Sequence, residues 1–131
     1  MSTATEALLA LSEAFRARDL EAALACFVEE AAFTYAGSEL GEVACGKEEL
    51  RDLLGKVFSR EVSYSWTPRQ VWESSHGPHL LVLAELTGCV HTGLDIEEFA
   101  YRISGVLGHD KEDRWRWLLL HGAEPSPGPP P

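Results

Sequence analysis

Two polar side chains near the end of the chain, Arg102 and His121, stand among tryptophans and could do chemistry. A guanidinium offers a planar fork of hydrogen-bond donors that fits a carboxylate or a phosphate. An imidazole changes its charge near neutral pH and can carry a proton between reacting groups. These residue types therefore predict either a site that holds a small anionic ligand through Arg102 or one that moves a proton through His121.

Both residues also have a structural interpretation, which stays open. Arg102 can form an internal salt bridge with Glu85 or Glu98. A histidine is commonly hydrogen-bonded to its own fold, and catalysis by His121 requires a second titratable group, such as Glu85, within hydrogen-bond reach.

Other reactive side chains give weaker patterns. Cys89 and His91 would point the same way on a strand, like a thiol-imidazole pair, but no third orienting group is in view. His76 and His79 flank a Gly-Pro turn without a third metal ligand within reach. The chain has no glycine-rich phosphate loop and no nucleophile elbow. We therefore expect no metal and no cofactor.

The stretch that contains Arg102 and His121 has the pattern of two β-strands joined by the charged loop 108–113, and it covers residues 97–124. Apolar residues occupy both faces of both strands. A sheet with one wet face would show a polar residue at every second position, so we expect helices to cover one face and a partner subunit to cover the other.

We expect Leu107 to pair with Arg114 in this hairpin. Under that register Arg102 lies opposite Leu119, on a face that forms the wall of a pocket. The same face also carries Trp117 and His121. The opposite face points away from the helices and is predicted to form a dimer interface. Its members are Tyr101, Ile103, Leu118 and Leu120.

The preceding chain predicts helices first and strands afterwards. A capping box at residues 3–6 begins one helix, and Asp19 caps a second that runs to the Glu29-Glu30 pair. The clearest helical periodicity covers residues 47–58. The remaining expected segments are a short strand at 32–35, a loop at 38–46, a strand from residue 61 bent at Pro68, and a strand at 79–91.

Composition limits the possible partners. At 131 residues the chain is one domain, which we assign to residues 1–124, followed by a disordered proline-rich tail at 125–131. A net charge of -10 argues against nucleic acid and against anionic membrane surfaces. The cysteines are three, an odd number without metal or disulfide spacing, and no signal peptide or membrane span is visible. We expect a cytoplasmic protein.

The order of elements resembles a known superfamily, as do Gly46-Lys47-Glu48-Glu49-Leu50 at a helix start, the strand Tyr101-Arg102-Ile103-Ser104 and the closing strand 114–122. It is similar to the nuclear-transport-factor-2-like, or SnoaL-like, α+β cone over about residues 4 to 124. The resemblance implies three helices packed in a strongly curved, mainly antiparallel sheet, with a conical pocket and a dimer formed by the outer sheet face.

Two branches of that superfamily can be compared residue by residue. Ketosteroid isomerase-like members use a tyrosine and two aspartates at positions that hold Leu11, Tyr35 and Phe99 here. With these groups absent, isomerase activity of that type has no base and no oxyanion hole. The association domain of calcium/calmodulin-dependent protein kinase II resembles the end of the chain more closely, with a pocket arginine at Arg102 and a histidine at His121. Its last motif has a serine where this chain has Ala123.

These observations predict a homodimeric module that binds a small organic molecule, such as a carboxylate, in a conical pocket. The residues expected to bind it are Arg102, His121, Trp117, Tyr35 and Trp66. One alternative is a small enzyme of the cyclase, isomerase or dehydratase type with His121 as its acid or base. Another is a protein-interaction module with a vestigial pocket.

Overall fold

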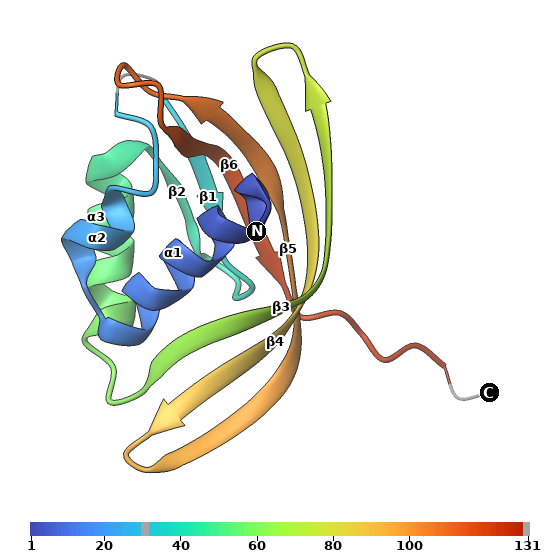
Figure 1. The fold of residues 1–131 in the computed structure, drawn as a ribbon. Helices are drawn as coiled ribbons and strands as arrows, with labels where there is room; N and C mark the ends of the chain where they lie inside the picture. The colour runs from blue at the N-terminus through green and yellow to red at the C-terminus, as the bar shows by residue number, and fades with distance from the viewer. Residues whose placement is uncertain (30–31, 130–131) are drawn as a thin grey trace.

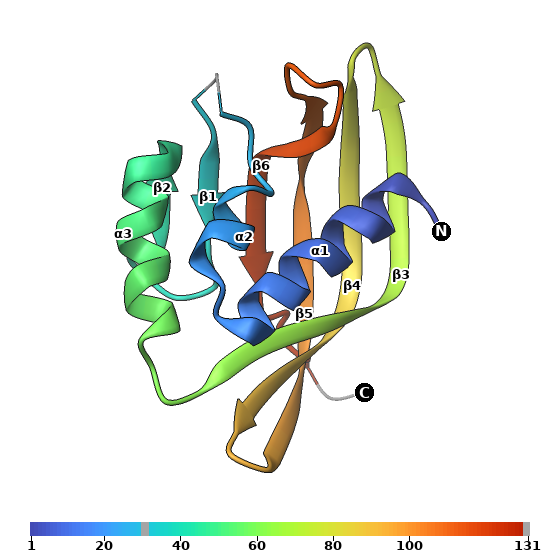
Figure 2. The same cartoon turned by 60° about the vertical axis from the view of Figure 1, so that its left-hand side comes forward.

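Three helices lie against one face of a curved six-stranded sheet, which confirms the predicted α+β cone (Figures 1 and 2). This computed structural model describes residues 1–29 and 32–129. The helices are α1 (Thr3–Ala17), α2 (Leu20–Leu24) and α3 (Gly46–Phe58). The strands are β1 (Thr34–Ala36), β2 (Val43–Cys45), β3 (Ser63–His76), β4 (His79–Thr92), β5 (Asp95–His109) and β6 (Trp115–Ala123).

The strand order is β2-β1-β6-β5-β4-β3, with β1 and β6 parallel and the other neighbours antiparallel. Strand β2 lies in the segment 38–46, where we had expected only a loop. It forms because the Gly37 amide donates to the Glu42 carbonyl at 2.8 Å, which closes a short hairpin against β1. Three residues are too few to show an alternating pattern in the sequence.

The helix starts agree with the sequence to within one residue. The Ser2 hydroxyl accepts the Thr5 amide at 3.1 Å, so α1 is capped by Ser2 and not by Thr3. Asp19 caps α2 as predicted, with its carboxylate accepting the Ala22 amide at 3.1 Å. The helix α2 ends at Leu24 and does not continue to the Glu29-Glu30 pair as expected, and Glu30 itself lies outside the described residues.

The register of the β5–β6 hairpin differs from the expected one. Leu107 pairs with Trp117 and Arg102 with Ala123, and the register shifts between Val106 and Leu107. The cause is the turn that follows β5. The Asp110 carboxylate accepts the amides of residues 112 and 114, both at 2.9 Å, so the turn begins later than the pattern suggested.

The helices also cover a different face of the hairpin from the one expected to carry Arg102 and His121. Ile103 and Leu120 were expected at a dimer interface but are 1% and 2% exposed, within the core under the helices. Arg102 and His121 lie on the outer face instead. The expectation was wrong because both faces of these strands are apolar, so the pattern alone could not show which one the helices cover.

Long bent strands make the sheet curve around the helices. The bend expected at Pro68 is present as a register shift between Pro68 and Gln70. Ser12 of α1 holds this part of β3, since its hydroxyl donates to the Trp66 carbonyl at 2.9 Å and accepts the Trp66 amide at 2.8 Å. The first half of β3 is therefore fixed to α1.

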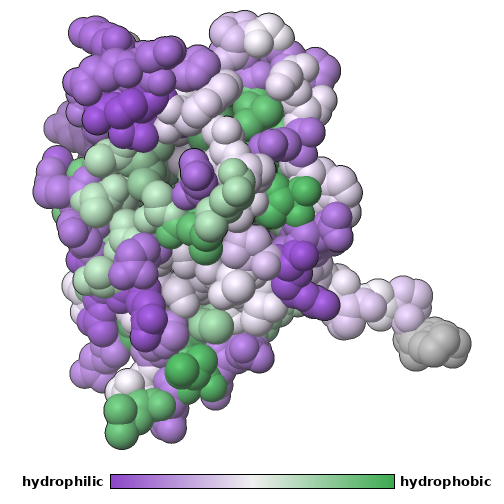
Figure 3. All heavy atoms as spheres, viewed as in Figure 1, coloured by the Kyte–Doolittle hydropathy of each residue, from purple (hydrophilic) through white to green (hydrophobic). Residues whose placement is uncertain are grey.

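The ends of the molecule complete this description. Leu94 and Ile96 expose hydrophobic atoms at the tip of the β4–β5 hairpin, at the bottom of the view in Figure 3. Residues 125–129 contain no helix or strand, and Pro130 and Pro131 of the expected tail lie outside the described residues. Over residues 1–29 and 32–129, none of the helices combines the length and the apolar character that crossing a membrane requires.

Candidate functional site

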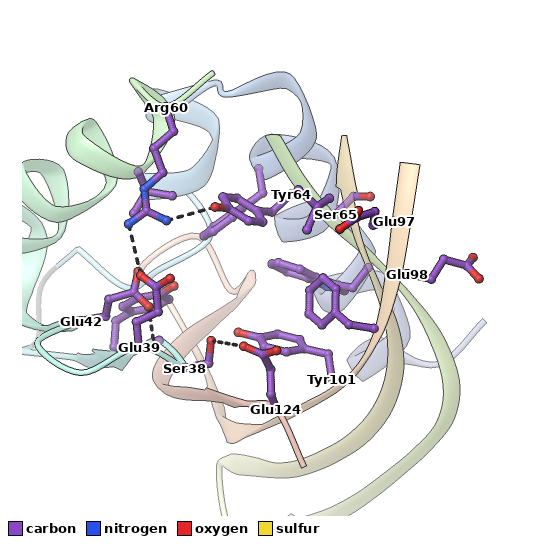
Figure 4. A pocket seen from close by; sticks show the side chains of 17 residues that line it. Ser38, Glu39, Glu42, Arg60, Tyr64, Ser65, Glu97, Glu98, Tyr101 and Glu124 are labelled. Atoms are coloured by element: carbon purple, nitrogen blue, oxygen red, sulfur yellow. Dashed lines mark hydrogen bonds and ion pairs between the residues drawn. The ribbon is translucent and has the colours of Figure 1, made fainter. Parts of the chain in front are cut away.

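A cavity of about 310 Å³ lies between the helices and the concave side of the sheet (Figure 4). Its lining comes from α1, the end of α3, the β1–β2 turn, strands β3 to β5 and the end of β6. Aromatic rings and carboxylates dominate the lining. The aromatic members are Phe15, Tyr35, Tyr64, Trp66, Phe99 and Tyr101.

Strands β3 and β5, which lie on either side of β4, hold three of these rings next to one another. Trp66 donates its indole N–H to the Leu8 carbonyl at 2.9 Å, which fixes its ring in place. The ring centroids of Trp66 and Tyr101 are 6.1 Å apart. Phe99 meets Tyr101 edge to face, with centroids 5.6 Å apart and planes at 79°. These contacts give the cavity a preformed aromatic wall.

Two glycines make room for this wall. Gly88 lies between Trp66 and Phe99 in the sheet, and a Cβ atom there would collide with the Phe99 ring. A Cβ atom on Gly122 would collide with the Tyr101 hydroxyl and ring. The absence of a side chain at these two positions is therefore what lets the rings lie flat over the strands.

Two tyrosine hydroxyls meet carboxylates inside the cavity. Burial raises the pKa of Tyr101 to about 12, a hydrogen bond to Ser38 opposes the rise, and the charges of Glu42 and Glu124 add to it. Burial also raises the pKa of Tyr35, and Tyr101 and Glu42 add to that shift. Both phenols are therefore neutral near pH 7.

Tyr35 is only 6% exposed, yet its hydroxyl has no hydrogen-bond partner within residues 1–29 and 32–129. The hydroxyl is not among the fully enclosed polar atoms of the described residues, so water or a ligand can reach it. The cavity is the place from which such a partner can come.

The charged residues of the lining are mostly acidic. One basic residue, Arg60, lines the cavity among the described residues. It donates to the Tyr64 hydroxyl at 3.0 Å and to the Glu39 carboxylate at 3.2 Å, as the dashed lines in Figure 4 show. The carboxylates are Glu39, Glu42, Glu97, Glu98 and Glu124. Arg60 therefore already has its partners.

The structure divides the residues predicted for the site. Tyr35 and Trp66 line the cavity, whereas Arg102, His121 and Trp117 do not. Arg102 forms the salt bridge to Glu85 that was its structural alternative, with Nε donating to Oε1 at 2.9 Å. The predicted pocket wall was on the wrong face of the sheet, because apolar residues on both faces of β5 and β6 left open which face the helices cover.

The other two predicted residues have structural surroundings. His121 is exposed on the outer face, opposite Ser104. Trp117 is buried in the core, and its indole N–H has no partner in the part of the chain that the structure describes.

His91 contacts a different residue from the one suggested by the sequence. Its Nε2 atom lies 2.7 Å from the hydroxyl of Ser65, which lines the cavity, and no hydrogen bond joins the ring to the Cys89 thiol. Within the described residues His91 has no second hydrogen-bond partner that would orient the ring. No three or more His, Cys, Asp or Glu side chains of the described segments gather in a way that could hold a metal ion.

The sequence analysis missed several residues of the lining. Their signal is present but is not local, because Phe99 and Tyr101 are aromatic residues whose neighbours across the sheet include Gly88 and Gly122. The β1–β2 turn was treated as an ordinary loop, although it supplies Ser38, Glu39 and Glu42.

No protein-family model matches the chain, and no curated protein matches it. Solved structures do. A candidate dehydratase of the NTF2-like family from Streptomyces avermitilis superposes with a TM-score of 0.80 at 14% identity, over 95% of this chain and 94% of that one. A ketosteroid isomerase-like protein from Erwinia carotovora atroseptica has a TM-score of 0.72 at 20% identity, over 93% of each chain.

A third similar structure is a candidate calcium/calmodulin-dependent protein kinase type II association domain from Thiobacillus denitrificans, with a TM-score of 0.69 at 18% identity, over 92% of this chain and 93% of that one. These likenesses establish the NTF2-like, or cystatin-like, fold that the sequence resembled. Because one fold carries many unrelated functions, the site has to supply the functional argument.

Proposed function

We propose that this protein is a homodimeric binding module that holds a small organic molecule in the conical cavity. The observation that carries the proposal is Tyr35, a residue that is 6% exposed, lines a cavity with aromatic walls and has a hydroxyl without a hydrogen-bond partner in the described chain. A volume of about 310 Å³ is at the lower end of the range of small-molecule sites. The lining, apolar inside with a few polar groups, has the usual composition of such sites.

The proposed ligand-binding residues are Tyr35 and Trp66, joined by Phe99 and Tyr101. A carboxylate ligand would need a free cation, and the sequence had assigned that role to Arg102. In the structure Arg102 is paired with Glu85 on the outer face, and Arg60 in the cavity is paired with Glu39. The cavity therefore favours an organic ligand without a carboxylate group over one that carries such a group.

The outer face of the sheet supports the homodimer. Trp72 pairs with Leu83, and Leu81 lies opposite Val106, which lies opposite Leu119. An apolar patch of this kind on a sheet face without helices is typical of a subunit interface. The exposed fractions of its large members are 48% for Trp72, 42% for Leu81, 41% for Leu83 and 42% for Leu119. Arg102 and His121 adjoin the patch, and we assign them to the rim of the interface.

We also propose that the protein works in the cytoplasm. Cys26, Cys45 and Cys89 are all free thiols, as expected in a reducing compartment.

Titration with a panel of small aromatic compounds tests the binding function. Amide resonances of Trp66, Phe99 and Tyr101 should shift together, and Tyr35→Phe should weaken binding of a hydrogen-bonding compound about fivefold, the equivalent of one neutral hydrogen bond. Ser104→Ala removes a hydroxyl from the outer face and serves as the control. If no compound shifts the cavity resonances, the protein-interaction alternative with a vestigial pocket replaces this proposal.

An enzyme of the cyclase, isomerase or dehydratase type is the second candidate. His121 is exposed on the outer face, so the proton carrier in such an enzyme would be His91, acting through the Ser65 hydroxyl at 2.7 Å. One structure with the same fold is named as a candidate dehydratase. Turnover that is lost in both Ser65→Ala and His91→Gln but retained in His121→Gln would favour this candidate over simple binding.

A further inference from the structure

We propose that the ligand of this cavity is an organic ammonium ion, a protonated amine carried on an apolar body. This inference rests on the proposed binding function and adds the charge of the ligand. It departs from the sequence, whose pocket arginine suggested an anion.

The charge of the lining is the first argument. Five glutamates and one arginine line the cavity among the described residues, and the whole chain carries a net charge of -10. A cavity with walls of low dielectric constant concentrates such a field at its opening and attracts ions of the opposite sign. A carboxylate ligand would be repelled from the same place.

Arg60 does not offset this field. Its guanidinium is shared between the Glu39 carboxylate at 3.2 Å and the Tyr64 hydroxyl at 3.0 Å. Its charge is thus balanced by Glu39, and Glu42, Glu97 and Glu124 have no basic partner among the side chains that the structure describes, whereas the Glu98 side chain points away from the cavity (Figure 4). An entering cation would be their counter-ion.

The aromatic wall is the second argument, because the faces of aromatic rings attract cations. The cavity already contains one such contact, since the Arg60 guanidinium carbon lies 6.0 Å from the centroid of the Tyr64 ring. Trp66, Phe99 and Tyr101 provide further rings deeper inside. The apolar body of an amine would pack on these rings with its charge near their faces.

The inner polar groups are the third argument. The Tyr35 hydroxyl, which has no hydrogen-bond partner in the described chain, has an oxygen that can accept an ammonium N–H. A phenol can also donate to an anion, so Tyr35 alone does not decide the charge. Glu42 lines the same cavity and favours a cation, because its negative charge also adds to the rise in the pKa of both Tyr35 and Tyr101. A negative ligand at this position would experience the same repulsion.

The test compares three probes that share one phenyl ring and differ in charge: phenethylamine, phenethyl alcohol and hydrocinnamate. Calorimetric titration at pH 7 and low salt should rank the amine first and the carboxylate last. The amine should bind at least about fivefold more tightly than the alcohol, the effect of one opposite charge at about 4 Å in water. Raising the salt from about 0.01 M to about 0.15 M should weaken binding of the amine alone.

Glu42→Gln should weaken amine binding about fivefold and leave alcohol binding unchanged. Glutamine keeps a side-chain oxygen that can accept the Glu39 amide N–H, as the Glu42 carboxylate does at 2.9 Å. Glu48→Gln makes the same change of charge at an exposed position of α3 outside the cavity and should leave amine binding unchanged. Glu124→Gln repeats the test at the other side of Tyr101 if Glu42→Gln does not fold.

The outcomes separate the two proposals. If the alcohol or hydrocinnamate binds as tightly as the amine, or Glu42→Gln behaves like Glu48→Gln, the charge inference is wrong while the binding site stands. If none of the probes shifts the resonances of Trp66 and Tyr101, both proposals fail. Tighter binding of a lysine side chain in a capped peptide than of phenethylamine would keep the ammonium chemistry and assign it to a protein partner.

Discussion

Arg102 donates its Nε–H to the Glu85 carboxylate at 2.9 Å across neighbouring strands of the outer sheet face. The two side chains remain 45% and 36% exposed, so water screens their charges. Exposed pairs of this kind contribute about 0.2 to 1 kcal/mol. The arginine that the sequence marked as a ligand group is therefore a surface salt bridge of modest energy.

Replacing this arginine should change the stability of the protein little. We expect Arg102→Ala to lower the free energy of unfolding by less than about 1 kcal/mol, measured by urea denaturation. Ser12→Ala is the contrasting variant, because it leaves the buried Trp66 amide and carbonyl without their side-chain partner and should cost about 1 to 3 kcal/mol. A loss from Arg102→Ala as large as that from Ser12→Ala would contradict the exposed salt bridge.

Two glycine substitutions should have different consequences. A methyl group on Gly122 meets the far end of the Tyr101 side chain, which must move toward the cavity. A methyl group on Gly105 meets the backbone carbonyl of Leu119, which cannot move without breaking the β5–β6 pairing. Both substitutions overpack the structure and should lower the free energy of unfolding by about 1 to 3 kcal/mol, with Gly105→Ala at the upper end.

Ligand binding distinguishes these two variants further. Gly122→Ala should weaken binding of any cavity ligand more than its loss of stability suggests, because the displaced Tyr101 ring would occupy part of the space in which the ligand binds. Measured melting temperatures and probe affinities check both statements. Unchanged affinity in Gly122→Ala would show that Tyr101 does not border the bound molecule.

The outer face should form the dimer. We expect a dimer in sedimentation at micromolar concentration, and Leu83→Glu should yield monomers because it places an unpaired charge at the centre of the apolar patch. Leu94→Glu is the matched control, since Leu94 is fully exposed at the tip of the β4–β5 hairpin and away from the patch. A dimer that survives Leu83→Glu and dissociates in Leu94→Glu would move the interface to the hairpin tip.

Stability should decline at high pH, in part through Tyr101. Its pKa is about 12 in the folded protein and about 10 in an unfolded chain. Above about pH 10 the unfolded state therefore loses a proton that the folded state keeps, so the contribution is full below about pH 10 and is lost as the pH rises toward 12. Tyr101→Phe should flatten the dependence by less than about 1.4 kcal/mol per pH unit.

Denaturation curves of the wild type and Tyr101→Phe between pH 8 and 11 measure this difference. Two other groups act with the same sign in both proteins, since burial raises the pKa of Cys26 to about 11 and also raises that of Tyr35. The difference between the curves therefore reports Tyr101 together with the part of the Tyr35 shift that Tyr101 causes. Parallel curves would indicate that water reaches the Tyr101 hydroxyl freely.

The sequence by itself determined the features that depend on near neighbours. The helical period of residues 47–58 predicted α3, which begins one residue earlier. Asp19 caps α2, and the strand bends next to Pro68, both as expected. Each of these rests on contacts within about four residues, such as a side chain accepting an amide in the first helical turn or a proline that cannot donate to a ladder. The order of such elements was enough to indicate the α+β cone.

Only the tertiary structure decided which residues meet in the cavity. Tyr35 and Trp66 were found from the sequence, whereas Arg102 and His121 were assigned to the wrong face. The register of β5 and β6 depends on where the Asp110 turn starts and on the shift between Val106 and Leu107, which places Trp117 in the core while His121 stays on the outer face, but neither feature decides which face the helices cover. With both faces apolar, hydrophobicity could not correct that choice, so packing against the helices decided it.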